Sequence, residues 1–127
     1  MKHRVLVVED NALNRELLCD WLDVEGYEVC NASTLQDARR LSEEETPAIV
    51  LLDVQLGNED GLMFAAWMRE DERFRGVPVI AVTAHAMLTE QARILQSGCN
   101  ACVPKPIDFA ALREQMRRWL ALPGKPR

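Results

Sequence analysis

Short runs of aliphatic residues alternate along the chain with longer stretches in which apolar residues recur every three or four positions. The runs are typical of strands buried on both faces of a sheet, and the periodic stretches are typical of amphipathic helices. The run from Ile49 to Asp53 is the clearest, because it is aliphatic throughout and then ends in a carboxylate. We predict strands over residues 4–8, 27–31, 49–53, 77–82 and 100–104.

A periodic stretch follows each run, and residues near its ends predict where the helix starts and stops. Ser33 and Gln36 match a capping box, which predicts the start of the second helix. Gly26 and Gly98 are suited to end the first and fourth helices, because glycine readily adopts the conformation that follows a helix end. Residues 54–60 are predicted to form a loop.

The alternation of strand and helix is repeated without an internal sequence repeat, which predicts an α/β fold. The fold class is a doubly wound (βα)5 parallel sheet with helices on both faces, in which the crossovers are right-handed. A chain of 127 residues is long enough for one such domain with one hydrophobic core. We assign residues 1–121 to this domain and residues 122–127 to a C-terminal tail.

Polar residues collect at the same end of the predicted strands. Carboxyl ends of parallel strands meet at one rim of the sheet, where open α/β folds place their ligands. Each residue alone fits a turn, a helix cap or a surface position, but that explanation does not cover the whole set. The set consists of Glu9, Asp10, Asp53, Thr83 and Lys105.

These side chains together predict phosphoryl-transfer chemistry. Three carboxylates in one crevice repel one another unless a cation is present, and hard oxygen ligands with open positions suit Mg²⁺. Lys105 supplies a second positive charge, and the hydroxyl of Thr83 can donate a hydrogen bond to a phosphoryl oxygen. An aspartate in this setting can attack phosphorus and form an aspartyl-phosphate.

Composition and charge exclude several other classes of function. The formal net charge of −5 argues against direct nucleic-acid binding, which depends on Lys and Arg neutralising phosphates. The apolar runs are far too short to span a bilayer, and the start of the chain lacks the apolar segment of a signal peptide. We therefore expect a cytoplasmic protein that does not insert into membranes.

Cys99 and Cys102 form a C-x-x-C pair, which raises the question of redox or metal chemistry. Thioredoxin-like motifs place the first cysteine at a helix N-terminus, whereas this pair enters a predicted strand. A zinc site would need a second pair, and Cys19 and Cys30 are isolated. We interpret the cysteines as reduced thiols with a packing role.

The residues at the strand ends resemble those of a two-component response-regulator receiver domain. The resemblance covers residues 4 to about 121, and it is greatest for stand-alone receivers of the cell-division-control type and for receivers attached to hybrid kinases. It rests on Val-Val-Glu-Asp-Asn, Leu-Leu-Asp-Val-Gln-Leu, Asp-Gly, Val-Thr-Ala-His-Ala and Pro-Lys-Pro at residues 7–11, 51–56, 60–61, 82–86 and 104–106.

The resemblance implies a strand order of 2-1-3-4-5 and a role for each residue at the rim. Asp53 would be the phosphoacceptor, and Glu9, Asp10 and Asp53 would surround Mg²⁺ together with the backbone carbonyl of Gln55. The resemblance also implies that Thr83 donates a hydrogen bond to the phosphoryl group and that Lys105 places a positive charge beside it. The peptide bond between Lys105 and Pro106 is expected to be cis.

Positions beside these residues distinguish this chain within the family. Gln55 and His85 lie two positions after Asp53 and Thr83, where family members tune how fast water reaches the phosphoryl group. Gly57 replaces a usual proline, so we expect a more mobile loop there. Cys102 replaces the aromatic residue that turns inward together with the threonine in the family's switch, and a thiol cannot fill that volume.

The resemblance implies a signalling protein rather than a conventional enzyme. It would catalyse its own phosphorylation and slow dephosphorylation, taking the phosphoryl group from a sensor histidine kinase or a histidine phosphotransfer protein and then changing its binding to a partner. Alternatively, it would be a phosphorelay intermediate or phosphate sink that passes the group to another histidine protein. A hydrolase of free phosphate esters would share the Mg²⁺ chemistry but would need additional substrate-binding sequence.

Overall fold

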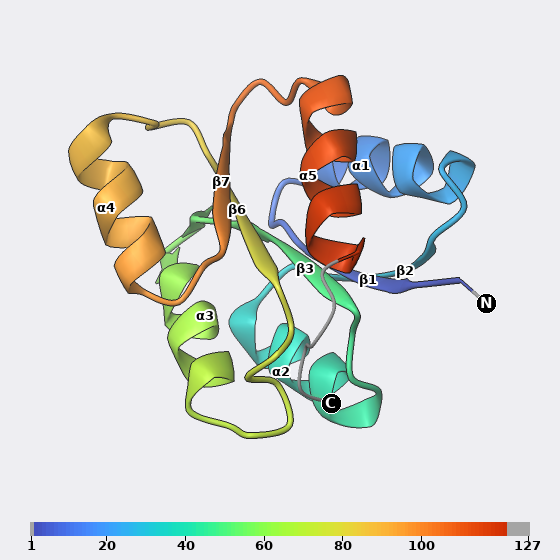
Figure 1. Cartoon of the computed structure of the whole chain (residues 1–127), viewed down its shortest axis with the longest axis horizontal. Helices are drawn as coiled ribbons and strands as arrows, with labels where there is room; N and C mark the ends of the chain where they lie inside the picture. The colour runs from blue at the N-terminus through green and yellow to red at the C-terminus, as the bar shows by residue number, and fades with distance from the viewer. Residues whose placement is uncertain (1, 122–127) are drawn as a thin grey trace.

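The structure, a computed structural model, describes residues 2–121 and contains one parallel sheet of five strands. Their order is β2-β1-β3-β6-β7, which is 2-1-3-4-5 when only the strands of this sheet are counted (Figure 1). The strands are β1 (Arg4–Val8), β2 (Glu28–Ala32), β3 (Ile49–Asp53), β6 (Val79–Thr83) and β7 (Ala101–Pro104). The predicted fold class is therefore confirmed, with strand boundaries displaced by at most two residues.

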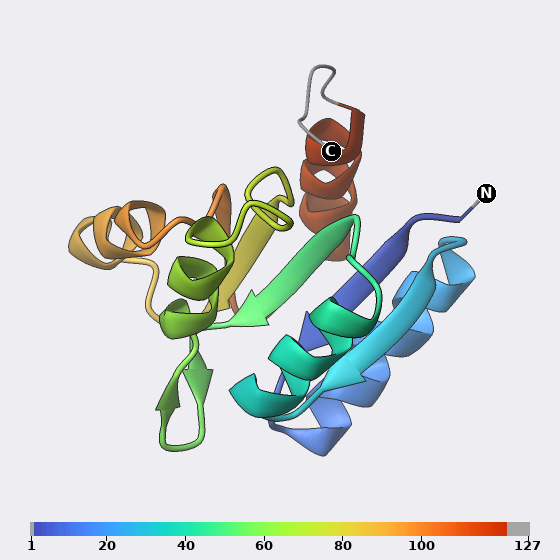
Figure 2. The same cartoon turned by 90° about the horizontal axis from the view of Figure 1, so that it is seen from below.

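Helices cover both faces of the sheet (Figures 1 and 2). One face carries the first and last helices, and the opposite face carries the second and third, while the fourth lies beside β7. In chain order they are α1 (Ala12–Val24), α2 (Leu35–Glu44), α3 (Leu62–Arg69), α4 (Leu88–Gln96) and α5 (Phe109–Ala121).

The aliphatic run of β3 is buried on both faces of the sheet. Ile49 and Leu51 pack into the core beneath α1 and α5, while Val50 and Leu52 pack into the core on the opposite face. This alternation explains why the run contains no polar residue before its end. Burying one such side chain stabilises the fold by roughly 1.5–3 kcal/mol, so β3 anchors both layers.

The register of the sheet brings the polar strand ends to one rim. Val8 pairs with Leu52, so Glu9 follows its strand beside Asp53. On the other side of β3, Asp53 pairs with Val82, and Thr83 is the next residue of β6. The backbone amide of Lys105 then donates to the carbonyl of Thr83 at 2.8 Å. The predicted clustering at one rim is therefore observed.

The start of the second helix differs from the prediction. The cap is Thr34 rather than Ser33, and its side chain accepts a hydrogen bond from the backbone amide of Asp37 at 3.1 Å. Both hydroxyl residues suit a cap, but Thr34 is the one with extended backbone directly before the first helical residue. The predicted helix ends at Gly26 and Gly98 are observed, and both glycines have positive φ.

A small antiparallel hairpin stands where a loop was predicted after β3. Its strands are β4 (Gln55–Leu56) and β5 (Glu59–Asp60), and it projects from the sheet in Figure 2. Gly57 has a φ of +56° and begins the two-residue turn between these strands, a position that favours glycine. Each strand is only two residues long, which is too short for an alternation of apolar and polar residues to predict it.

Two further expectations concern the C-terminal tail and membrane insertion. The predicted tail, residues 122–127, lies outside the described residues. Among the residues that are described, no helix is long and apolar enough to cross a membrane.

Candidate functional site

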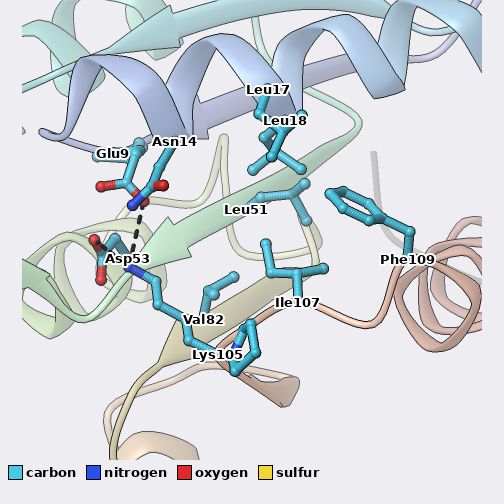
Figure 3. A pocket seen from close by; sticks show the side chains of 12 residues that line it. Glu9, Asn14, Leu17, Leu18, Leu51, Asp53, Val82, Lys105, Ile107 and Phe109 are labelled. Atoms are coloured by element: carbon cyan, nitrogen blue, oxygen red, sulfur yellow. Dashed lines mark hydrogen bonds and ion pairs between the residues drawn. The ribbon is translucent and has the colours of Figure 1, made fainter.

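Lys105 joins the ends of β1 and β3 through its ammonium group (Figure 3). Its Nζ atom lies 3.1 Å from Oδ2 of Asp53 and 3.4 Å from Oε1 of Glu9. Both carboxylates are buried, with 6% of each residue exposed. A buried charge is stable only when it is paired, so the three side chains form one electrostatic unit.

Backbone amides fix the remaining carboxylate oxygens. Oδ1 of Asp53 accepts a hydrogen bond from the amide of Gln55 at 3.1 Å, and Oε2 of Glu9 accepts one from the amide of Asn11 at 3.1 Å. Asn11 also caps α1 through its side chain, which accepts from the amide of Asn14 at 2.9 Å. The orientation of both acids is therefore set by the start of the element that follows each strand.

The pKa values of the charged groups reflect their burial and proximity. The pKa of Glu9 is raised to about 7, mainly by burial; the amide of Asn11 opposes this rise, and the neighbouring Asp53 carboxylate adds to it. Burial by itself would lower the pKa of Lys105, but the hydrogen bond and negative charge of Asp53, together with Glu9, raise it overall. The rim therefore combines an ammonium that stays charged with an acid that titrates near neutrality.

Glu9, Asp10 and Asp53 together could hold a metal ion. Each offers a carboxylate oxygen, and these ligand atoms all lie within 4.8 Å of one another. Asp10 is exposed, which leaves one side of the cluster open to water and substrate. Hard oxygen ligands with open positions fit Mg²⁺, which retains waters and bridges carboxylates to phosphate. A Cβ at Gly57 would lie 3.4 Å from Oδ2 of Asp10, close to ordinary van der Waals contact, so glycine is favoured here by its positive φ rather than by lack of space.

The structure explains why the Asp-Gly motif at residues 60–61 needs a glycine at its second position. The amide of Gly61 donates to the carbonyl of Val54 at 2.7 Å, which brings the end of the hairpin against the strand that carries Asp53. A Cβ atom at this position would overlap the backbone carbonyl of Asp53. Glycine is therefore needed for the chain to pass so close to the candidate phosphoacceptor.

Thr83 and His85 lie beside the carboxylates. The hydroxyl oxygen of Thr83 accepts a hydrogen bond from the backbone amide of His85 at 3.0 Å and lies 3.4 Å from the carbonyl of the same residue. Thr83 is buried, whereas the side chains of His85 and Gln55 are exposed. The geometry thus places both candidate tuning residues on the solvent side.

The cysteine pair has the properties of packed thiols. Cys99 and Cys102 are free cysteines, and both are in or against the core under α3 and α4. Burial raises the pKa of Cys99 to about 11 and also raises that of Cys102. A raised pKa disfavours the reactive thiolate, which agrees with the interpretation of reduced, unreactive cysteines.

An apolar cavity adjoins the carboxylates, and no pattern in the sequence predicts it. It has a volume of about 450 Å³ and continues from Asp53 and Lys105 along the underside of α1 (Figure 3). The apolar residues that line it come from at least four separated parts of the chain, which only the fold brings together. The lining includes Leu17, Leu18, Leu51, Val82, Ile107 and Phe109.

The acids, lysine and threonine at the end of the central strand have the chemistry of a Mg²⁺-dependent phosphoryl-transfer site in an α/β domain. The family model of the response regulator receiver domain matches residues 5–117. The chain therefore belongs to the response regulator receiver domain family. This confirms the resemblance that the strand-end motifs indicated.

Relatives of this chain include stand-alone receivers and receivers of kinases. The polar-differentiation response regulator DivK of Brucella ovis is 39% identical over 120 residues, which cover 94% of this chain and 98% of that protein. The receiver domain of the sensor histidine kinase PA1611 of Pseudomonas aeruginosa, solved with magnesium in its active-site cleft, is 31% identical. It has a TM-score of 0.88 and covers 96% of this chain and 100% of its own.

A third similar structure contains a partner protein. The receiver domain of Ssk1 from Saccharomyces cerevisiae was crystallised with the histidine phosphotransfer protein Ypd1. It is 28% identical to this chain, with a TM-score of 0.85, and the match covers 93% of this chain and 88% of that one. One receiver similar to this chain thus has magnesium in its active-site cleft, and another forms a complex with a histidine phosphotransfer protein.

The raised pKa of Glu9 predicts how pH affects the site. Without a metal, Glu9 keeps its proton up to about pH 7, whereas the unfolded chain releases it near 4.5. Because the folded state then binds more protons, the free energy of unfolding should decrease as pH rises through this interval. Mg²⁺ requires the ionised carboxylate, so its affinity should instead decrease as pH falls below about 7, approaching tenfold per pH unit.

Both trends can be measured on one protein. Urea unfolding in EDTA across the pH interval gives the first, and calorimetric Mg²⁺ titration gives the second. Glu9→Gln is the control, since an amide does not titrate and should flatten both dependences. A wild-type Mg²⁺ affinity that stays constant through this interval would contradict the prediction.

Proposed function

We propose that the protein is a single-domain response regulator that accepts a phosphoryl group on Asp53 in a Mg²⁺-dependent reaction and then changes its binding to a partner. The observation that carries the proposal is the contact between Asp53 and Lys105 at 3.1 Å, within a cluster of carboxylates that can hold a divalent cation. Asp53 ends the central strand of the sheet, where a ligand can approach from solvent.

Each residue has a separate task in this reaction. An oxygen of Asp53 attacks phosphorus, the bond to the donor breaks, and the donor leaves with the bonding electrons. Lys105 places positive charge beside the phosphoryl oxygens, and the hydroxyl of Thr83 can rotate to donate a hydrogen bond to one of them. Glu9, Asp10, Asp53 and the carbonyl of Gln55 would hold Mg²⁺, which neutralises negative charge on the transferred group when bound.

We propose a sensor histidine kinase or a histidine phosphotransfer protein as the phosphodonor. The complex of Ypd1 with the similar receiver of Ssk1 supports this choice. The first turns of α1 also expose two leucines next to the site: 76% of Leu13 and 58% of Leu17 is accessible. Apolar side chains at such positions favour contact with a helical protein surface.

Incubation with acetyl phosphate tests the central step without a partner protein. In the presence of Mg²⁺ we expect one phosphoryl group per chain by intact mass, and little or none in EDTA. The adduct should be labile to hydroxylamine, as an acyl phosphate is. An absence of labelling, or labelling that EDTA does not affect, would contradict the proposal.

A specific observation favours a second function, the phosphorelay intermediate or phosphate sink. Cys102 occupies the position of the family's switch aromatic, and the described structure packs it half-buried against the core. If no ring moves inward on phosphorylation, less of the signal reaches the surface around α4. The domain would then pass phosphate to another histidine protein without a strong change of shape.

Partner binding with and without beryllofluoride distinguishes the two functions. This phosphoryl mimic should increase or decrease affinity for an output partner severalfold if the domain is a switch. Equal affinity in both states, measured for a partner that also exchanges phosphate with the domain, would favour the relay.

His85→Ala is expected to change the lifetime of the aspartyl-phosphate. The exposed imidazole lies two residues after Thr83, at the solvent side of the site, where it can affect the approach of water. We expect a change of severalfold in the decay rate after removal of acetyl phosphate, followed by intact mass. An unchanged rate would remove His85 from the mechanism and leave it as a surface residue.

A further inference from the structure

The cavity beside Asp53 has two chemically different ends. Glu9, Asp53 and Lys105 stand at one end, and the other end is apolar (Figure 3). The apolar end is enclosed by Leu17 and Leu18 of α1 on one side and by Ile107 and Phe109 on the other. The phosphoryl-transfer chemistry described above uses the polar end together with Asp10, Gln55 and Thr83, which line an adjoining hollow, and it leaves the apolar end unused.

The size and lining of the cavity are those of a small-molecule site. A volume of about 450 Å³ falls in the range of roughly 300–1,000 Å³ that is typical of ligand pockets. Such pockets combine apolar walls with a few polar groups that orient the ligand. Here the polar groups include the candidate nucleophile itself, so a molecule bound in the apolar end reaches the reacting atom without leaving the cavity.

We propose that the apolar end receives the acyl chain of an acyl phosphate, so that this site prefers small-molecule donors with acyl groups longer than acetyl. The inference rests on the proposed function, since it names the donor class of the same site. The phosphoryl group would lie at Asp53 and Lys105, while the chain extends past Lys105 between Leu17 and Ile107.

The chemical step is a simple displacement. An oxygen of Asp53 forms a bond to phosphorus, and the bond between phosphorus and the acyl oxygen breaks. The acyl group leaves as a carboxylate anion with the bonding electrons, so neither an oxidant nor a further co-reactant is needed. The cavity contributes binding of the part of the donor that does not react.

The expected preference follows from the burial of methylene groups. One buried methylene stabilises a bound state enough to raise kcat/KM about fourfold. Butyryl phosphate has two more methylenes than acetyl phosphate, so full burial would favour it by roughly fifteenfold. Because the two donors have similar acyl groups at the reacting bond, the ratio of their rate constants reports mainly on the chain.

The test measures phosphorylation rate constants with acetyl phosphate and with butyryl phosphate in the presence of Mg²⁺. We compare wild type with Leu17→Asp, which places a carboxylate on the cavity wall, and with the milder Leu17→Ser. Leu13→Asp is the matched control, because it adds the same charge one turn earlier on α1, at a residue that does not line the cavity. Taking the ratio of the two donors cancels effects of the added charge on the phosphoryl group.

Wild type and Leu13→Asp are expected to prefer butyryl phosphate by roughly fifteenfold, whereas Leu17→Asp should bring the ratio close to one and Leu17→Ser should give an intermediate value. Labelling by acetyl phosphate without a preference for the longer donor would overturn this inference alone. A preference that survives in Leu17→Asp would also overturn it. Failure of both donors to label the wild type would overturn the proposed function and this inference together.

Discussion

Asp53→Asn is expected to abolish phosphorylation by acetyl phosphate, with a loss of several orders of magnitude in the rate. The amide has nearly the shape of the carboxylate, but its oxygen is a poor nucleophile and it carries no negative charge for a cation. Nothing else in the site can replace it, because Glu9 takes up a proton near neutrality and Asp10 lies at the exposed edge of the cluster.

The substitution should leave the fold intact, which separates chemistry from stability. Burial is the main cause of the raised pKa of Glu9, and removing the second buried acid relieves the smaller part that Asp53 adds, while Lys105 keeps its contact with Glu9. Asp60→Asn is a matched control at an exposed carboxylate on the neighbouring hairpin, and it should be labelled like wild type. Phosphorylation of the Asp53→Asn protein at the wild-type rate, followed by intact mass, would contradict the assignment.

Arg69→Met is expected to lower the free energy of unfolding by about 3 kcal/mol or more. The guanidinium of Arg69, at the end of α3, has no carboxylate partner among its hydrogen bonds. It instead donates to five oxygens between 2.8 and 3.3 Å away, which tie the segment before β6 to the segment before β7. They are the carbonyls of Phe74, Arg75, Val77 and Gly98 and the side-chain oxygen of Asn100.

Methionine keeps most of the length of the side chain but cannot donate to any of these oxygens. Several are partly buried, and a buried acceptor without a partner costs about 1–3 kcal/mol. Arg40→Met is the control, because Arg40 is exposed on α2 and its ion pair with Glu44 contributes little. Urea unfolding should show a lower midpoint for Arg69→Met at an unchanged m-value. Equal midpoints for the two variants would show that this network does not stabilise the fold.

The central strand and the rim could be predicted because their signals are local and mutually consistent. Ile49 to Leu52 must be apolar on both faces, and only a parallel sheet covered on both sides satisfies that pattern. Once the strands are parallel, Asp53, Thr83 and Lys105 must meet at one edge. Their convergence follows from topology and does not depend on details of packing.

Other features could not be predicted because they depend on contacts between distant segments. Nothing near Arg69 in the sequence indicates that its guanidinium reaches the carbonyl of Gly98. The cavity is formed where Leu17 faces Ile107, residues that lie in separate elements. The choice of Thr34 over Ser33 as a helix cap is a shift of one residue between two equally suitable side chains.

Cys102 stands at a position where this chain lacks a residue that the family uses to transmit the signal from the site. The residues that we propose to bind the phosphoryl group are all present, whereas the position of the family's switch aromatic holds a half-buried thiol against the core. Any change of shape on phosphorylation must therefore depend on Thr83 and the backbone that follows it, where the hydroxyl already interacts with His85. Partner binding with and without beryllofluoride therefore tests whether phosphorylation changes the shape of the domain when no aromatic residue can move.

The most direct test of the central claim is to locate the phosphoryl group. Sodium borohydride reduces an aspartyl-phosphate to homoserine, which peptide mass spectrometry assigns to one residue. After treatment with acetyl phosphate and Mg²⁺, we predict homoserine at position 53 and nowhere else in the chain. Homoserine at Asp10 or another acid, or none after a labelled sample is reduced, would contradict the account.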